Sequence, residues 1–132
     1  MFKKLSVILL VAMLVVVVFA PAVGAQAHTR TFANSARFDS QPVQGVTFIA
    51  RNQMGYTVGS CITAANGDCS FSATVYEGDS YTVQAIYSPW YINMWSNQVA
   101  FDTSGGAFHG QLRMSYWSQD TLTLFQGWGW RE

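Results

Sequence analysis

The chain has 132 residues, seven Lys and Arg against seven Asp and Glu, and an aromatic content of 15% beside only 11% charged residues. Both lysines stand within the first four residues, so the chain beyond residue 25 carries five arginines against seven acids, a formal net charge of −2. That part of the chain has no basic stretch, which argues against nucleic acid or an anionic membrane surface as a partner.

The N-terminus predicts an exported protein. A basic start at Lys3 and Lys4 precedes an apolar run over residues 5–20, and small residues follow. This order is typical of a secretory signal peptide. We therefore expect a protein that is secreted or extracytoplasmic, either in the periplasm or at the cell surface.

The boundary of the leader has two candidate positions. We predict a signal peptide over residues 1–25, with cleavage after Ala25 or after Ala27, because small residues precede both points. The remainder, residues 28–132, has the length of one domain. If the apolar run continued to Ala25 it would reach the length of a membrane span, so an uncleaved anchor stays open as an alternative.

Alternation of apolar and polar residues with a period of two recurs beyond the leader, and this pattern is typical of strands with one buried face. Residues 28–41 are the least defined stretch and predict either a first edge strand or a loose leader. After them, the apolar positions of successive runs are Val46, Phe48 and Ala50; Phe71, Ala73 and Val75; Tyr81, Val83, Ala85 and Tyr87; Val99 and Phe101; Leu112, Met114 and Tyr116; and Leu122 and Leu124.

Turn signals such as Asn66-Gly67 and Gly105-Gly106 separate these runs, and no amphipathic helical stripe follows the leader. Short strands of this number in about 100 residues indicate an all-β fold. We predict a single antiparallel β-sandwich of about seven strands, immunoglobulin-like or transthyretin-like.

The only two cysteines, Cys61 and Cys69, flank the Asn66-Gly67 turn. If the flanking strands pair as a hairpin, the two thiols come close enough to bridge, and in an exported protein they should be oxidised. A redox-active or metal-binding pair would need a Cys-x-x-Cys-like spacing or nearby histidines, and neither is present. We therefore predict a structural Cys61–Cys69 disulfide.

The segment PVQGVTFIARNQMGYTVGSCITAANGDCSFSATVYEGDSYTVQA, residues 42–85, resembles the carboxypeptidase-regulatory-like, transthyretin-like domains and the collagen-adhesin B-type domains of bacterial surface proteins. The shared positions are Pro-Val-x-Gly-Val at 42–46, Thr63 with Gly67, Phe71, Gly78, and Tyr81 with Val83. The resemblance implies a non-catalytic accessory, adhesive or structural domain.

The chain departs from those families in two ways. Ala64 stands where an acid often follows the turn threonine, and the cysteine pair is an addition. The lysine–asparagine isopeptide bond of many B-type adhesin domains is impossible beyond the leader, because that part of the chain contains no lysine.

Sequence motifs for catalysis are missing. No Gly-x-Ser-x-Gly, His-Glu-x-x-His or paired-carboxylate motif occurs, so we expect no catalytic residues, no cofactor and no enzyme. One metal alternative stays open. Cleavage after Ala27 would make His28 the N-terminal residue, whose amine and imidazole could bind copper together with His109. The competing interpretation is that both are exposed histidines, one in the leader and one in a glycine-rich loop.

Aromatic residues are the main functional lead. The candidate ligand-binding aromatics are Trp90, Tyr91 and Trp95 around Pro89, and Trp128 and Trp130 near the C-terminus. Exposed flat rings can stack on sugars or anchor protein interfaces. The alternative is that they close the open end of a small core. We expect Trp95 to point inward, and Trp128 and Trp130 to point outward.

These observations predict a secreted, non-enzymatic β-sandwich with a binding, adhesive or surface-structural role. Its expected partner is a cell-surface glycan or another envelope protein, with no nucleic acid and no membrane once the leader is removed. Two alternatives stay open: a carbohydrate-binding module that uses the exposed Trp and Tyr residues, and a copper-binding exported protein that uses an N-terminal histidine.

Overall fold

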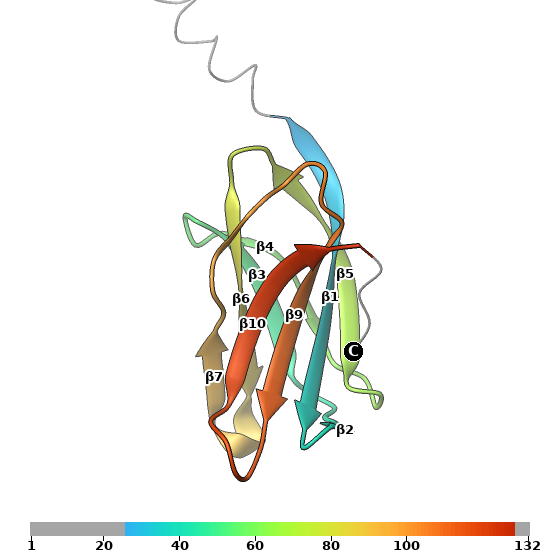
Figure 1. Ribbon diagram of the computed structural model, residues 1–132, viewed down its shortest axis with the longest axis vertical. Coiled ribbons are helices and arrows are strands. Elements are labelled where there is room, and N and C mark those ends of the chain that lie inside the picture. Colours follow the sequence, from blue (N-terminus) through green and yellow to red (C-terminus); the bar gives the residue numbers. More distant parts are fainter. Residues whose placement is uncertain (1–25, 129–132) are drawn as a thin grey trace, which may run out of the picture.

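The computed structural model describes residues 26–128, which form two five-stranded sheets packed as a β-sandwich (Figure 1). The predicted signal peptide and Trp130 lie outside the described residues. The first sheet has the order β10-β9-β1-β2, with β5 also paired to β1, and the second has the order β4-β3-β6-β7, with β8 also paired to β6. The predicted sandwich is confirmed. Within residues 26–128 no helix is long and apolar enough to span a membrane.

The elements have the following bounds. In the first sheet they are β1 Ala27–Phe38, β2 Gln41–Pro42, β5 Asp68–Tyr76, β9 Ala107–Met114 and β10 Thr121–Gly127. In the second they are β3 Thr47–Asn52, β4 Thr57–Ile62, β6 Ser80–Tyr87, β7 Ile92–Trp95 and β8 Val99–Ala100, with a short 3-10 helix, η1, over Ser88–Trp90.

The first strand, β1, lies in the centre of its sheet and not at an edge. It pairs antiparallel with β5 and β2 on one side and parallel with β9 on the other, over Phe32–Phe38 and Phe108–Met114. The expectation of an edge strand or a loose leader over residues 28–41 is therefore wrong, and the sheet is mixed. The sequence of β1 obscured this because the buried set includes the polar residues Asn34 and Ser35 beside Phe32 and Ala36.

A row of aromatic rings across three neighbouring strands forms the centre of the core. Phe32 on β1 stacks on Phe71 of β5, with ring centroids 5.2 Å apart, and on Phe108 of β9, at 4.6 Å. Tyr81 of the opposite sheet packs edge-on against Phe32 and Phe108. Such aromatic pairs stabilise the fold beyond the apolar area that they bury. Through Tyr81, this row of rings joins the two sheets.

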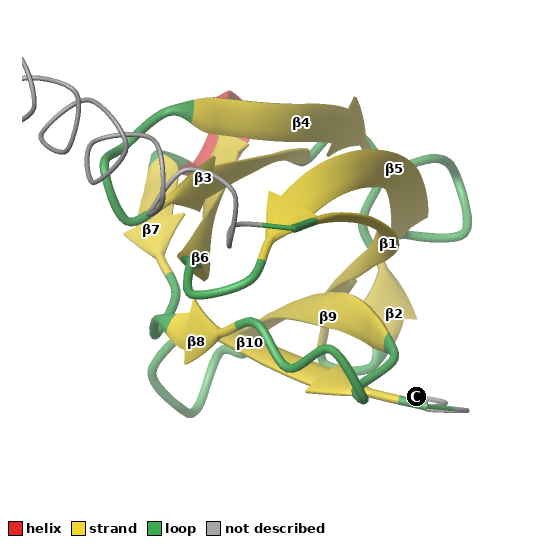
Figure 2. Ribbon diagram, turned by 90° about the horizontal axis from the view of Figure 1, so that it is seen from above, coloured by secondary structure: helices red, strands yellow, loops and turns green. Residues whose placement is uncertain are grey.

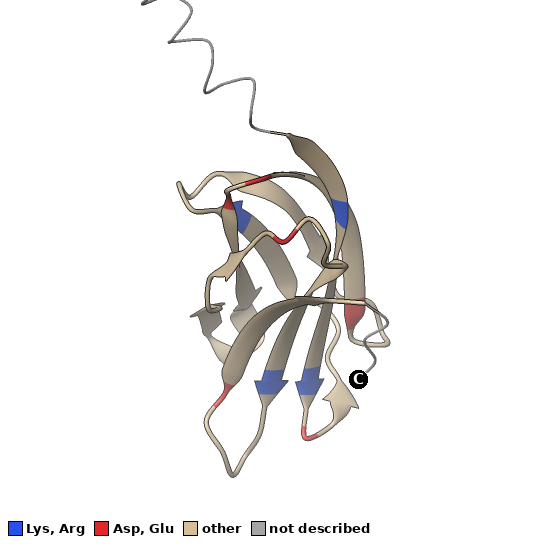
Figure 3. Ribbon diagram, turned by 45° about the horizontal axis from the view of Figure 1, so that its top comes forward, with Lys and Arg blue, Asp and Glu red and all other residues tan. Residues whose placement is uncertain are grey.

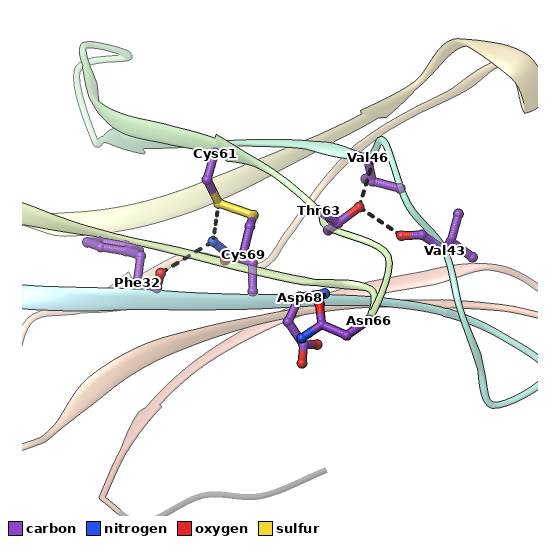
Figure 4. The surroundings of a disulfide bond; sticks show 9 residues. Phe32, Val43, Val46, Cys61, Thr63, Asn66, Asp68 and Cys69 are labelled. Atoms are coloured by element: carbon purple, nitrogen blue, oxygen red, sulfur yellow. Dashed lines mark hydrogen bonds between the residues drawn. A yellow bond between two sulfur atoms is a disulfide. The ribbon is translucent and has the colours of Figure 1, made fainter.

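The disulfide links the two sheets. Cys61 lies on β4 and Cys69 on β5, with an S–S distance of 2.05 Å and Cα atoms 5.9 Å apart (Figure 4). The bond is as predicted, but the hairpin proposed for it is wrong: β4 pairs only with β3 in a ladder, and β5 pairs with β1. Beneath it, the buried Asn34 directs its side-chain nitrogen towards Cys61 Sγ at 3.4 Å.

Figure 2 looks along the sandwich and shows β4 beside β5 at one flank. At this flank the ring of Phe71 lies against the backbone of Gly59, where an added Cβ would be 2.3 Å from the ring. The other flank is closed by Asn97, whose side chain accepts from the backbone N–H of Leu124 and donates to its carbonyl, both at 2.9 Å. Both flanks of the sandwich are thus closed by specific side-chain contacts.

The turn between β4 and β5 is held by Thr63 and Gly67. The buried Thr63 hydroxyl accepts from the Val46 N–H at 2.9 Å and donates to the Val43 carbonyl at 2.7 Å. Gly67 has a φ of +80°, and its carbonyl accepts from the Ala36 N–H. A Cβ at Gly67 would lie 2.7 Å from the Ala36 carbonyl oxygen, so this turn packs directly on β1.

Candidate functional site

Six aromatic residues gather at the end of the sandwich where β1, β6 and β9 finish. We call this set the aromatic end; it consists of Phe38, Tyr87, Trp90, Tyr91, Tyr116 and Trp117. They come from the end of β1, the end of β6, the η1 helix and the loop from β9 to β10, all at the lower end in Figure 1. Two of them, Trp90 and Tyr91, were predicted as ligand-binding aromatics from the sequence.

Phe38 is the centre of the aromatic end. Its ring lies 5.3 Å from Trp90 and 4.7 Å from Tyr116, and Trp90 also packs edge-on against Tyr87 at 5.0 Å. These contacts fix the inner rings against the sandwich. Tyr91 and Trp117 then project furthest, with 95% and 93% of their surfaces exposed.

Backbone geometry explains why these rings point outward. The hairpin from β1 to β2 turns through Asp39 and Ser40, both at positive φ, which is the geometry of a tight two-residue hairpin loop. Tyr91 also has a positive φ, of 54°, directly after η1, and this conformation reverses the chain into β7. The aromatic side chains therefore stand on short, defined turns.

Tyr116 and Trp117 were missed as site residues. The alternation Leu112, Met114, Tyr116 predicted a buried tyrosine, but β9 ends at Met114 and Tyr116 is exposed. The signal was present in the sequence, since Tyr116-Trp117 directly precedes the turn residues 118–120. Two adjacent large aromatics at the start of a loop cannot both follow the inward side of a strand.

Trp95 lies on the outer face of the second sheet, which corrects the expectation that it points inward. In β7 the inward positions are Ile92 and Met94, so Trp95 falls on the opposite side and stands across from Gln84 of β6. The side chain is 54% exposed. It is therefore separate from Trp90 and Tyr91, although the three are close in sequence.

A cleft lies beside Trp95, with a volume of about 420 Å³. Its lining residues are Arg51, Asn52, Gln53, Gly55, Thr82, Trp95 and Gln98. The guanidinium carbon of Arg51 lies 5.5 Å from the centre of the Trp95 ring. Arg51 donates to the Thr57 hydroxyl at 2.8 Å and to the Gln84 side-chain oxygen at 3.2 Å, which are both neutral acceptors.

Trp128 lies at the end of the sandwich opposite the aromatic end. Its indole N–H donates to the Ser104 carbonyl at 2.9 Å, and the side chain is 74% exposed. The loop beneath it is ordered by Asp102, whose carboxylate accepts from the hydroxyl and the backbone N–H of Ser104. These hydrogen bonds lower the pKa of Asp102 from its ordinary value.

The two histidines lie apart. His28 contacts Glu77 at 3.1 Å and is opposite Val75 in the β1–β5 ladder, while His109 is opposite Ala33 in the β1–β9 ladder. Five residues of extended chain between His28 and Ala33 correspond to about 16 Å. The structure does not bring the two imidazoles together. His109 is also only 7% exposed within β9, so its placement in an exposed loop is wrong.

Over residues 26–128, no three or more His, Cys, Asp or Glu side chains are grouped so as to hold a metal ion. Charged residues are sparse over the sandwich (Figure 3); an ion pair joins Arg37 to Asp68, and His28 contacts Glu77. The exposed aromatic groups are therefore the most distinctive surface features. No protein-family model matches the chain, and no curated protein matches it.

Proposed function

We propose that the chain is an exported, non-catalytic binding domain that contacts its partner through the aromatic end. The observation that supports this is the exposure of Tyr91, Tyr116 and Trp117 on short turns at one end of a closed sandwich. Contiguous exposed aromatics mark interaction sites, because tyrosine and tryptophan offer a large contact area with little conformational freedom to lose.

The disulfide is consistent with an oxidising compartment, which agrees with the proposed export. The resemblance to the carboxypeptidase-regulatory-like and transthyretin-like domains implies the same kind of accessory or adhesive role, and membership of that group is part of the proposal. The partner proposed is a component of the cell envelope, either a surface protein or a glycan.

A binding screen against glycans and isolated cell-wall material tests this proposal. The test variant is Tyr91→Ala/Trp117→Ala, and Trp128→Ala is the matched control, because Trp128 is also exposed but lies at the opposite end. We expect the double variant to lose binding with a thermal midpoint close to that of the wild type, because both side chains contribute little to the core. Wild-type binding by the double variant would refute the proposal.

A carbohydrate-binding module is a second candidate. It is favoured by the half-exposed ring of Trp95 beside a cleft lined with amide and hydroxyl side chains. Aromatic rings stack on the faces of sugars, and amides bond sugar hydroxyls. In the same screen, selective retention of glycans over protein components would favour this candidate.

A further inference from the structure

The cleft on the outer face of the second sheet is a distinct surface from the aromatic end. Arg51 reaches it from β3, Thr82 from β6 and Trp95 from β7, because alternate residues of these paired strands share one face. Its volume of about 420 Å³ is within the range of small-molecule sites. We propose that this cleft binds a saccharide residue that carries a carboxylate, such as a uronic acid unit.

The Trp95 ring supplies the stacking surface. Arg51 lies against one side of the ring, and more than half of the Trp95 side chain is still exposed. Trp95 also lines the cleft, so the open part of its ring there lies beside the Arg51 guanidinium. A sugar ring that enters the cleft can lie on this surface with its apolar C–H groups against the indole.

The polar lining supplies hydrogen bonds. Within the described residues the Thr82 hydroxyl and the Gln98 amide form no hydrogen bond with the protein, so both are free for ligand hydroxyls. The Gln53 amide is already used: it donates to Asp79 and accepts from the Ser80 N–H. Thr82, Gln98 and Trp95 line the same cleft, so a bound sugar could stack on the ring and form hydrogen bonds with both polar side chains.

The charge of Arg51 favours an acidic sugar over a neutral one. No carboxylate of residues 26–128 lies within ion-pair distance of its guanidinium, which donates only to neutral oxygens. Arg51 is the one formally charged residue among those that line the cleft. Asp79 accepts from the Gln53 side chain but is not among the residues that line the cleft. Three of the five guanidinium N–H groups of Arg51 donate to these neutral oxygens, and the Nε–H is buried without a partner among the described residues. A carboxylate in the cleft would therefore supply the missing counter-charge through the second Nη2 proton.

The probe for the experiment is an oligogalacturonate of six residues, with neutral maltohexaose as its comparison, titrated into the exported chain. Binding is measured by calorimetry, and the Trp95 indole N–H is followed by NMR. We expect the acidic oligosaccharide to bind at least about tenfold more tightly than the neutral one. We also expect that affinity to fall with added salt and the Trp95 resonance to shift.

The variants are Trp95→Ala, which removes the stacking ring, Arg51→Gln, which removes the charge, and Gln98→Ala, which leaves both in place. Trp128→Ala is the control, because Trp128 contacts Ser104 and does not line the cleft. We expect Trp95→Ala to weaken binding about tenfold or more, Arg51→Gln to abolish the preference for the acidic sugar, and Trp128→Ala to change nothing. Gln98→Ala, which breaks no protein hydrogen bond, keeps the test valid if Arg51→Gln fails to fold. It should weaken binding of both sugars.

The inference rests on the proposed binding role, but it concerns the cleft beside Trp95 and not the aromatic end. Equal affinity for the two sugars, an unshifted Trp95 resonance, or unchanged affinity in Trp95→Ala would overturn it. If oligogalacturonate does not bind while Tyr91→Ala/Trp117→Ala still abolishes envelope binding, only the cleft inference fails. If oligogalacturonate binds as expected but Tyr91→Ala/Trp117→Ala keeps wild-type envelope binding, only the proposal for the aromatic end fails.

Discussion

Breaking the Cys61–Cys69 disulfide should lower the free energy of unfolding by about 2.5 kcal/mol. The bond closes a loop with a sequence separation of 8 residues. In the chain-entropy treatment such a crosslink removes about 8 cal/mol/K from the unfolded ensemble, which is about 2.5 kcal/mol at 25 °C. For a domain of about 100 residues, this loss lowers the melting temperature by roughly 10 °C.

The assay is urea unfolding of three samples: the oxidised chain, the same chain reduced with a phosphine, and Cys61→Ala/Cys69→Ala. Reduction isolates the effect of the crosslink, because it cleaves the S–S bond to two thiols and keeps every heavy atom of the chain. The double variant also loses the contact of the Asn34 amide with Cys61 Sγ at 3.4 Å, so it should be less stable by a further ~1 kcal/mol. The phosphine should not affect the double variant, which serves as the control.

The dependence on urea gives a second measurement. Without the crosslink the unfolded chain exposes more surface, so the slope of unfolding free energy against urea should rise. A loss below about 1 kcal/mol on reduction, with an unchanged slope, would refute the reasoning from unfolded-state entropy. The packing of Phe71 against Gly59 would then be sufficient to hold β4 beside β5.

Further predictions rest on particular contacts. Thr63→Val should cost about 2–4 kcal/mol in urea unfolding, because two buried backbone groups lose their partner, whereas Thr63→Ser should keep most of the stability. Gly78→Ala, at a φ of +88° with open space around it, should cost about 1–2 kcal/mol. Gly67→Ala should cost about 3 kcal/mol or more, because a clash with the Ala36 carbonyl of β1 is added to the strain at positive φ. Equal losses of stability in Gly67→Ala and Gly78→Ala would contradict the close packing of Gly67 on β1. Burial raises the pKa of Tyr81 above its ordinary value of 10.0, so the protonated phenol stabilises the fold below pH 10 and this stability is lost as the pH rises further. Tyr81→Phe should show a smaller alkaline loss in thermal melts, and an identical pH profile would refute the assignment. N-terminal sequencing of exported protein should find Gln26 first, because the Gln26 carbonyl accepts from the Glu77 N–H at 3.1 Å and Ala27 pairs with Tyr76; a start at His28 would show that this end of β1 is dispensable.

The sequence predicted the core where alternation is regular and failed where polar residues are buried. Phe48, Val83 and Leu112 were assigned to the inward face and are fully buried. In β1, by contrast, Asn34 occupies an inward position because it packs under the disulfide, so the apolar alternation is interrupted. The parallel pairing of β1 with β9 joins segments some 75 residues apart, and no local pattern encodes a partner at that distance.

The candidate site was less predictable than the core for a related reason. The tryptophans were recognised as candidates by residue type, but their grouping depends on which strand face and which end of the sandwich each occupies. One residue decides the face: Met94 points inward, and its neighbour Trp95 points outward. Trp90 and Trp128 lie at opposite ends of the sandwich, because Trp90 follows the end of β6 and packs on Phe38, whereas Trp128 follows the end of β10 and bonds to Ser104.

The closed flanks limit how this domain can bind a partner. An exposed strand edge offers backbone hydrogen bonds to an added strand. Here the backbone groups of Leu124 in β10 are taken by Asn97, and the edges of β4 and β5 face each other beneath the disulfide. At these two flanks recognition would therefore use side chains rather than the addition of a strand. The aromatic end and the cleft share no residue, so substitutions in one should leave binding at the other unchanged and their effects should add.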